Sequence, residues 1–179
     1  YKKTNINFVL LVFIILAGFR YRVGPDTISY MLQFEELFYP LSELEYEDFL
    51  NIKYQPIWIL LNSFCKSVGN FILLQFIVAS VINICVFYFF KKTTTKLFSA
   101  LLIYFLIDYL YFNTDVMREA MAVGLFLVGI VKLQEKKLFL YYFIITICVL
   151  IHLWSFVCFF VPILLTKKVS YKLKIFIGS

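Results

Sequence analysis

The chain has 179 residues, of which 63% are hydrophobic, including 22 Phe and 13 Tyr, and its mean hydropathy is +0.88. This composition excludes a soluble globular domain, because too little polar surface is available to cover a fold of this size in water. The net charge of +6 lies in short clusters between apolar runs. That pattern is typical of membrane orientation signals and argues against nucleic-acid binding.

Five apolar runs are predicted to be membrane-spanning helices, given that a span needs about 20 mainly apolar residues and fewer where partners help. We predict an all-α fold: a polytopic transmembrane helical bundle that forms a single domain, with spans at about 5–19, 69–90, 97–112, 116–132 and 138–165. A shorter run at 56–65 is predicted to be interfacial or re-entrant. The chain opens without Met and ends in another apolar run, so we expect it to be the N-terminal portion of a longer protein.

Charge assigns the loops to the two sides of the membrane. Lysine clusters before the first run and after the runs 69–90 and 116–132 are predicted to be cytoplasmic. The loop 20–55 carries three basic and seven acidic residues, a net charge of −4, and is predicted to lie outside. The run 138–165 is interpreted as one tilted helix bent near Pro162, with a broken hairpin as the alternative.

The outer loop is predicted to carry short amphipathic helices. Asp26 and Thr27 are suitable N-caps for the first of them. Its apolar face would comprise residues at helical spacing, namely Tyr30, Phe34, Leu37 and Leu41. Residues 42–45 have the spacing of a capping box for a second helix. The acidic stretch 43–48 has no ligand pattern of fixed geometry, so a solvated surface is favoured over a metal site, and no metal is predicted.

The first candidate binding group follows the first apolar run, where Arg20 and Arg22 precede the turn Gly24-Pro25 and Asp26. Guanidinium groups bind phosphate oxygens in pairs, and the turn would let Asp26 face back toward the arginines. The alternative is that the arginines extend into the lipid headgroups and Asp26 caps a helix.

Two further polar residues interrupt apolar spans at a similar depth. Arg118 lies about one turn inside the outer boundary, where a charge needs a partner or a wet cavity, and Asp115 or Glu119 is the candidate for a purely structural partner. His152, the only histidine, stands roughly 20 Å up a hydrocarbon core of ~30 Å. A lone histidine in an apolar helix is more often a packing residue than a catalyst. Taken together with the arginines of the first group, however, these residues predict a site for an anionic, lipid-linked substrate.

No cofactor is expected from the sequence. The chain has no glycine-rich nucleotide loop, no Ser-x-x-Lys or His-Glu-x-x-His motif and no CxxC pair. Its four cysteines lie within or at the edge of apolar stretches without metal or redox spacing, which is typical of reduced packing residues.

Three segments together resemble the EpsG family of Wzy-type polysaccharide polymerases: Gly18 to Tyr30 with Phe34, Asn113 to Ala122 with Met117-Arg118, and Ile151-His152. The chain departs from the family pattern at two positions. Glu119 follows the arginine where the family commonly has Gln. Gln55 precedes Pro56 where the family commonly has Glu, so a carboxylate is lost at that position.

The resemblance implies a glycosyltransferase-type polymerase of the bacterial cytoplasmic (inner) membrane. It would join oligosaccharide repeat units carried on undecaprenyl pyrophosphate at the outer face, as in capsule, O-antigen or exopolysaccharide synthesis. Its partners would be this lipid-linked oligosaccharide, the lipid bilayer and other polysaccharide assembly proteins. The alternative is a non-catalytic lipid-linked sugar translocase or an assembly partner of a polysaccharide complex.

The resemblance also implies roles for the candidate residues. Arg20, Arg22 and Arg118 would bind the pyrophosphate, because cations stabilise the charge that develops on the leaving group. Asp26 would orient an arginine or the acceptor sugar. His152 would be the general base that takes the proton of the attacking hydroxyl.

Overall fold

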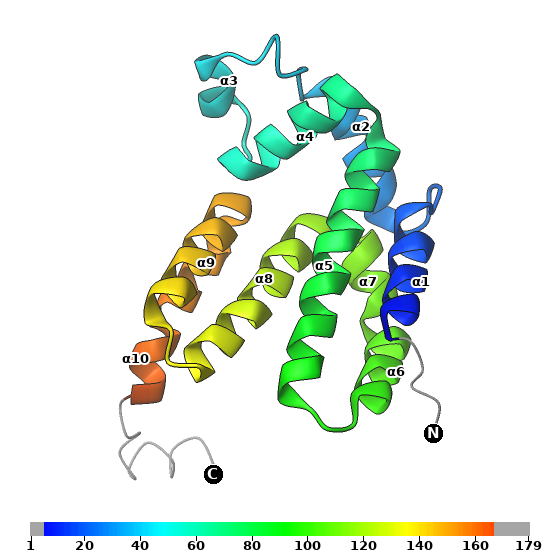
Figure 1. Cartoon of the computed structure of the whole chain (residues 1–179). Coiled ribbons are helices and arrows are strands. Elements are labelled where there is room, and N and C mark those ends of the chain that lie inside the picture. Colours follow the sequence, from blue (N-terminus) through cyan, green and yellow to red (C-terminus); the bar gives the residue numbers. More distant parts are fainter. Residues whose placement is uncertain (1–5, 167–179) are drawn as a thin grey trace, which may run out of the picture.

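The computed structural model describes residues 6–166, and within them the chain is helical without any strand (Figure 1). The elements in chain order are α1 (Ile6–Gly18), α2 (Pro25–Glu36), α3 (Tyr46–Asn51), α4 (Pro56–Val68), α5 (Phe71–Thr93), α6 (Leu97–Ile107), α7 (Tyr109–Thr114), α8 (Met117–Gln134), α9 (Leu138–Ile151), the 3-10 helix η1 (Leu153–Phe160) and α10 (Val161–Thr166).

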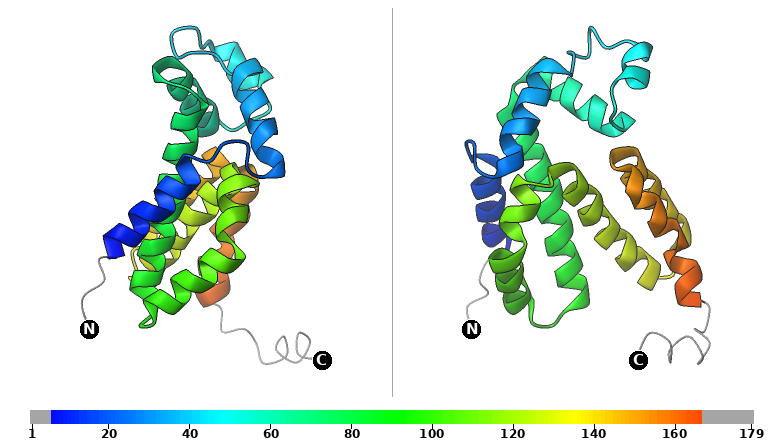
Figure 2. Two further views of the ribbon diagram at one scale, coloured as in Figure 1. Left: turned by 90° about the vertical axis from the view of Figure 1, so that its right-hand side faces the viewer. Right: turned by 180° about the vertical axis from the view of Figure 1, so that it is seen from behind.

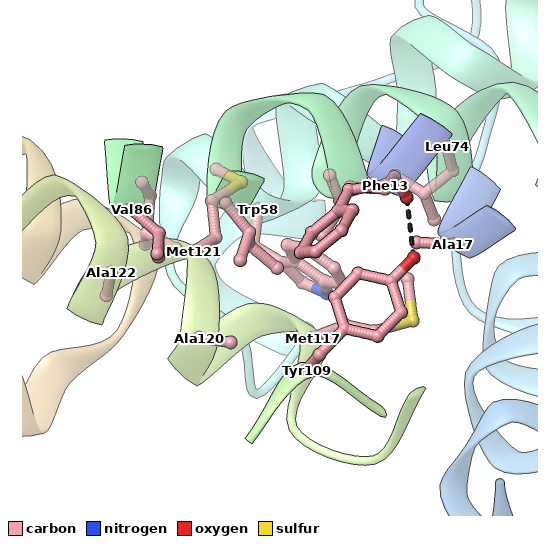
Figure 3. Close-up of a cluster of buried hydrophobic side chains, with 14 of the residues drawn as sticks. Phe13, Ala17, Trp58, Leu74, Val86, Tyr109, Met117, Ala120, Met121 and Ala122 are labelled. Atoms are coloured by element: carbon pink, nitrogen blue, oxygen red, sulfur yellow. Dashed lines mark hydrogen bonds between the residues drawn. The ribbon is translucent and has the colours of Figure 1, made fainter. Parts of the chain in front are cut away.

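The helices form a bundle with a cap at one end. Helix α5 packs against α1 and α8, and α8 packs in turn against α9 (Figure 2). Helices α2, α3 and α4, which we call the cap, lie beyond one end of this bundle, and α4 contacts both α5 and α9. Trp58 of the cap is 1% exposed and belongs to the same apolar core as Leu74 of α5 and Met121 of α8 (Figure 3).

Helix α5 alone among the described helices is long and apolar enough to cross a membrane by itself, and four shorter apolar helical segments accompany it. Its start is set by Asn70, whose Oδ1 accepts hydrogen bonds from the backbone N–H groups of Ile72 and Leu73 at 3.0 and 3.3 Å. Lys91 and Lys92 lie in its last turn, where cations stabilise the helix dipole.

The prediction of one helix over 138–165 is wrong. Helix α9 ends at Ile151, His152 is extended, and η1 and α10 return alongside α9 (Figure 2). The ring of Tyr142 stacks on that of Phe159 at 6.0 Å, which holds the two halves together. The hairpin brings α10 back to the side of the α8–α9 turn (Figure 1). The lysines that follow lie outside the described residues.

The predicted span 97–112 is also not one helix. It is interrupted at Asp108, after which α7 continues to Thr114. At the start of α7, the hydroxyl of Tyr109 donates a hydrogen bond to the carbonyl of Phe13 at 2.6 Å, so α7 is tied to α1 (Figure 3).

The prediction that Asp26 or Thr27 caps the first helix of the outer loop is wrong. Helix α2 begins earlier, with Gly24 at the N-cap position and Pro25 as the first helical residue. Proline is favoured there because its fixed φ suits a helix start and its missing N–H is not needed. The Thr27 hydroxyl instead faces the carbonyls of Val23 and Thr114, at 2.5 and 3.1 Å, and the second contact links the cap to α7.

The apolar face predicted for α2 is only partly correct. Phe34 is buried, but α2 ends before Leu37, so that Leu37 and Leu41 are each 43% exposed. The second short helix starts three residues later than predicted. Its capping box pairs Glu45 with Asp48, and the Glu45 N–H donates to Asp48 Oδ2 at 2.8 Å.

Three polar side chains, those of Asn83, Tyr104 and Asn113, meet inside the bundle. Asn83 Nδ2 donates to Asn113 Oδ1 at 3.0 Å, and Asn113 Nδ2 donates to the carbonyl of Tyr109 at 2.7 Å. The hydroxyl of Tyr104 lies 3.4 Å from Asn83 Oδ1. Because each buried amide has partners, this cluster links α5, α6 and α7 without leaving unsatisfied groups.

We expect Gly24→Ala to destabilise the fold by about 1–3 kcal/mol. Gly24 has a φ of 93°, and a Cβ there would lie 2.5 Å from the Cβ of Thr114. The measurement is the thermal unfolding of purified protein in detergent. Gly129→Ala is the matched control, because its Cβ would lie 3.5 Å or more from its neighbours. Equal stability of the two variants would contradict the prediction.

Candidate active site

Arg118 projects from the first turn of α8 and is half-buried beneath the cap. Its Nη1 donates to Gln55 Oε1 at 3.4 Å, and its Cζ lies 4.6 Å from the centroid of the Tyr54 ring. Burial raises the pKa of the Tyr30 hydroxyl, and the nearby charge of Arg118 opposes that shift. Two tyrosines and an amide thus surround the guanidinium, and cation–π contact stabilises it there.

Arg118 has no carboxylate partner within residues 6–166. Neither Asp115 nor Glu119 forms an ion pair with it. In the described part of the chain, the ion pairs are those of Glu135 with Lys132 and Lys137. The interpretation of Arg118 as half of a structural ion pair is therefore wrong. A half-buried guanidinium whose charge no acid neutralises is suited to an anionic ligand.

His152 lies at the reversal between α9 and η1 and is half-buried. Its Nδ1 is buried and has no hydrogen-bond partner within the described chain, so Nε2 is the nitrogen left to meet a substrate. The charges of Arg118 and Glu119 are close enough to act on its ring. Cys148 Sγ, 3.3 Å from the carbonyl of Ala122, helps to hold α9 against α8. The tertiary structure therefore brings Arg118 and His152 to one end of the bundle.

Arg20 lies on the other side of the start of α8 and is only 9% exposed. One terminal nitrogen donates to the carbonyl of Ala17, and the other lies 3.0 Å from the sulfur of Met117, the residue before Arg118. Its Nε is buried without a partner, and Arg20 belongs to no ion pair in the described chain. Burial lowers the pKa of Arg20 to about 10, with the charges of Tyr109 and Asp115 opposing, so it stays protonated at neutral pH.

Arg22, on the loop that leads into α2, and Asp26, in the first turn of α2, are both exposed. The Cζ of Arg22 lies 5.2 Å from the centroid of its neighbour Tyr21. Asp26 forms no ion pair with either arginine of the loop, so the expected turning back of Asp26 toward them does not occur. Arg20 and Arg22 nevertheless line a common cavity of about 190 Å³.

Sequence reasoning missed Tyr54 and set aside Gln55. The only signal at this position was the departure from the family pattern at Gln55-Pro56, and the loss of a carboxylate argued against a role there. In the structure Tyr54 and Gln55 are the residues that hold Arg118. The Tyr54 hydroxyl donates to Gln33 Oε1 of α2 at 2.6 Å, which fixes the ring over the guanidinium.

No group of three or more His, Cys, Asp or Glu side chains in residues 6–166 is arranged to hold a metal ion. The acidic stretch 43–48 contributes instead to the cap, since Glu45 and Asp48 form the capping box of α3. Near it, a cavity of about 570 Å³ is lined by Tyr39, Asp48 and Tyr54, among others. Tyr54 thus lines this cavity and also contacts Arg118.

Comparison with known proteins gives one informative result. A family model described as the EpsG family matches residues 3–179, which include every residue that the structure describes. No curated protein and no solved structure gives a significant match.

Proposed function

The chain belongs to the EpsG family, and from this premise we propose that it polymerises oligosaccharide repeat units carried on undecaprenyl pyrophosphate. Membership supports a role in polysaccharide biosynthesis and association with a membrane. The lipid-linked donor, the location at the outer face of the bacterial cytoplasmic membrane and the multi-pass topology are parts of the proposal. In this topology the cap faces outward, and the α5–α6 and α8–α9 turns with their lysines face the cytoplasm.

The observation that carries the proposal is the environment of Arg118. Its charge is half-buried beneath the cap, held by Tyr54 and Gln55 rather than by an acid, and lies close to the only histidine. A transfer from a sugar pyrophosphate needs a cation for the departing oxygen and a base for the attacking hydroxyl. Arg118 and His152 supply these two groups at one site.

The proposed reaction is a substitution at the anomeric carbon of the donor sugar. The acceptor hydroxyl oxygen forms the new glycosidic bond while the bond to pyrophosphate breaks, and the proton passes to Nε2 of His152. The electron pair leaves with the undecaprenyl pyrophosphate, whose charge Arg118 stabilises with Arg20 and Arg22. Asp26, exposed and paired with neither arginine, orients the acceptor sugar.

The test is polymer formation by the complete natural protein in proteoliposomes supplied with its native undecaprenyl-pyrophosphate repeat unit. A ladder of products on a gel is the expected result. If well-folded protein yields no ladder but moves the lipid-linked unit across the bilayer, the protein is a translocase. If it does neither, it is a non-catalytic assembly partner.

A further inference from the structure

A groove between α1 and α6 has walls that are apolar throughout. It has a volume of about 320 Å³ and is lined by residues that include Val12 and Leu16 of α1 and Leu102 and Phe105 of α6. Among the described residues, no charged or hydrogen-bonding side chain lines it. The ring of Phe13 lies 5.4 Å from that of Phe105, so aromatic contact closes the groove on its inner side.

The groove continues toward the cap into a second cavity of about 220 Å³. Leu16 and Phe105 line both, and the second cavity is also lined by Arg20, Tyr109 and Thr114. Both α1 and α6 run toward the cap, so the groove follows their common direction (Figure 1). The hydrogen bond from the Tyr109 hydroxyl to the Phe13 carbonyl, visible in Figure 3, holds α7 beside α1 at this junction.

The path formed by the two cavities is polar at one end and apolar elsewhere. The end toward the cap holds Arg20, which is nine-tenths buried, has an unpartnered Nε and has no acidic partner in the described chain. Arg20 also lines the 190 Å³ cavity on the side of Arg22. A buried cation that forms no ion pair in the described chain favours an anion, whereas the rest of the path favours a hydrocarbon chain.

We propose that the groove between α1 and α6 binds the polyprenyl chain of the lipid-linked substrate, with the phosphate nearest the lipid at Arg20. The occupant is a single-chain amphiphile, since the groove runs as one apolar path that ends at one buried charge. The inference rests on the proposed function for the identity of the lipid. It places that phosphate beside Met117, directly before Arg118, so that both phosphates of the departing undecaprenyl pyrophosphate lie at the start of α8.

The first experiment fills the groove. Leu102→Trp introduces a bulky side chain into it, and Ile103→Trp is the matched control, because Leu102 and Ile103 are each 58% exposed but Ile103 does not line the groove. Polymerisation is measured with the repeat unit on undecaprenyl pyrophosphate and on geranyl pyrophosphate. For the long chain, Leu102→Trp is expected to lower kcat/KM about tenfold, as loss of roughly two buried methylene groups would. For the short chain, the kcat/KM of Leu102→Trp is expected to equal that of the wild type.

Three outcomes would overturn the proposal. They are no loss with Leu102→Trp, an equal loss for both chain lengths, and an equal loss with Ile103→Trp. If the wild type makes no polymer from either substrate, the proposed function fails, and the groove is judged by a second measurement.

That measurement is photocrosslinking with a diazirine-bearing polyprenyl phosphate, followed by mapping of the labelled peptides. Label on α1 and α6 that undecaprenyl phosphate displaces, but phosphatidylglycerol and inorganic phosphate do not, supports the proposal. Displacement by phosphatidylglycerol to the same extent would make the groove an ordinary phospholipid site. Label elsewhere in the chain would also overturn the proposal.

Discussion

Arg118→Ala is expected to lower the rate of polymerisation by about 10²–10³-fold, the usual cost of removing one preorganised group that stabilises transition-state charge. The fold should survive, because the Arg118 side chain makes one hydrogen bond, to Gln55, one ring contact, with Tyr54, and no ion pair in the described chain. The measurement is initial rate and chain length with the native lipid-linked repeat unit, beside thermal unfolding in detergent.

Two control variants separate the role of Arg118 from a general effect of charge. Arg118→Lys keeps the cation but loses the planar fork that binds two phosphate oxygens, so it should retain only part of the activity. Lys96→Ala removes an exposed cation at the opposite end of the bundle and should react as the wild type. If Arg118→Ala polymerises at the wild-type rate, Arg118 has no role in the reaction and the proposed site is wrong.

His152→Ala is expected to reduce kcat by about 10²–10⁴-fold, the range by which a positioned general base accelerates proton transfer. The side chain lies at the reversal between α9 and η1, with its Nδ1 buried and unpartnered. A base that takes the acceptor proton can be replaced by a small base from solution. Added imidazole should therefore restore part of the rate of His152→Ala.

A packing role for His152 predicts a different result. In that case His152→Ala would lower the unfolding temperature, and imidazole would not restore activity. Ser155→Ala, in the same reversal and also half-buried, is the matched control and should leave the rate unchanged. Unchanged polymer length and amount in His152→Ala would show that another group is the base.

Local patterns in the sequence predicted most helices of the bundle within a few residues. Helix α5 occupies Phe71–Thr93 against a predicted 69–90, and α8 occupies Met117–Gln134 against 116–132. These limits follow from nearby residues, such as the Asn70 side chain that caps α5. The reversal at His152 was not predicted as the preferred reading, because hydrophobicity alone does not distinguish one long apolar helix from two short halves packed together.

For the candidate site, too, part followed from the sequence and part from the packing of the helices. Composition and charge placement were enough to indicate membrane association, and the order of the motifs around Arg20, Arg118 and His152 was enough to indicate the family, because both depend on residue type and spacing along the chain. Only the tertiary structure decided which groups meet. It placed Tyr54 and Gln55 on Arg118, left Asp26 unpaired, and buried Arg20 against the sulfur of Met117. Such contacts join residues as many as 97 positions apart. They depend on how whole helices pack, and no local pattern in the sequence encodes that packing.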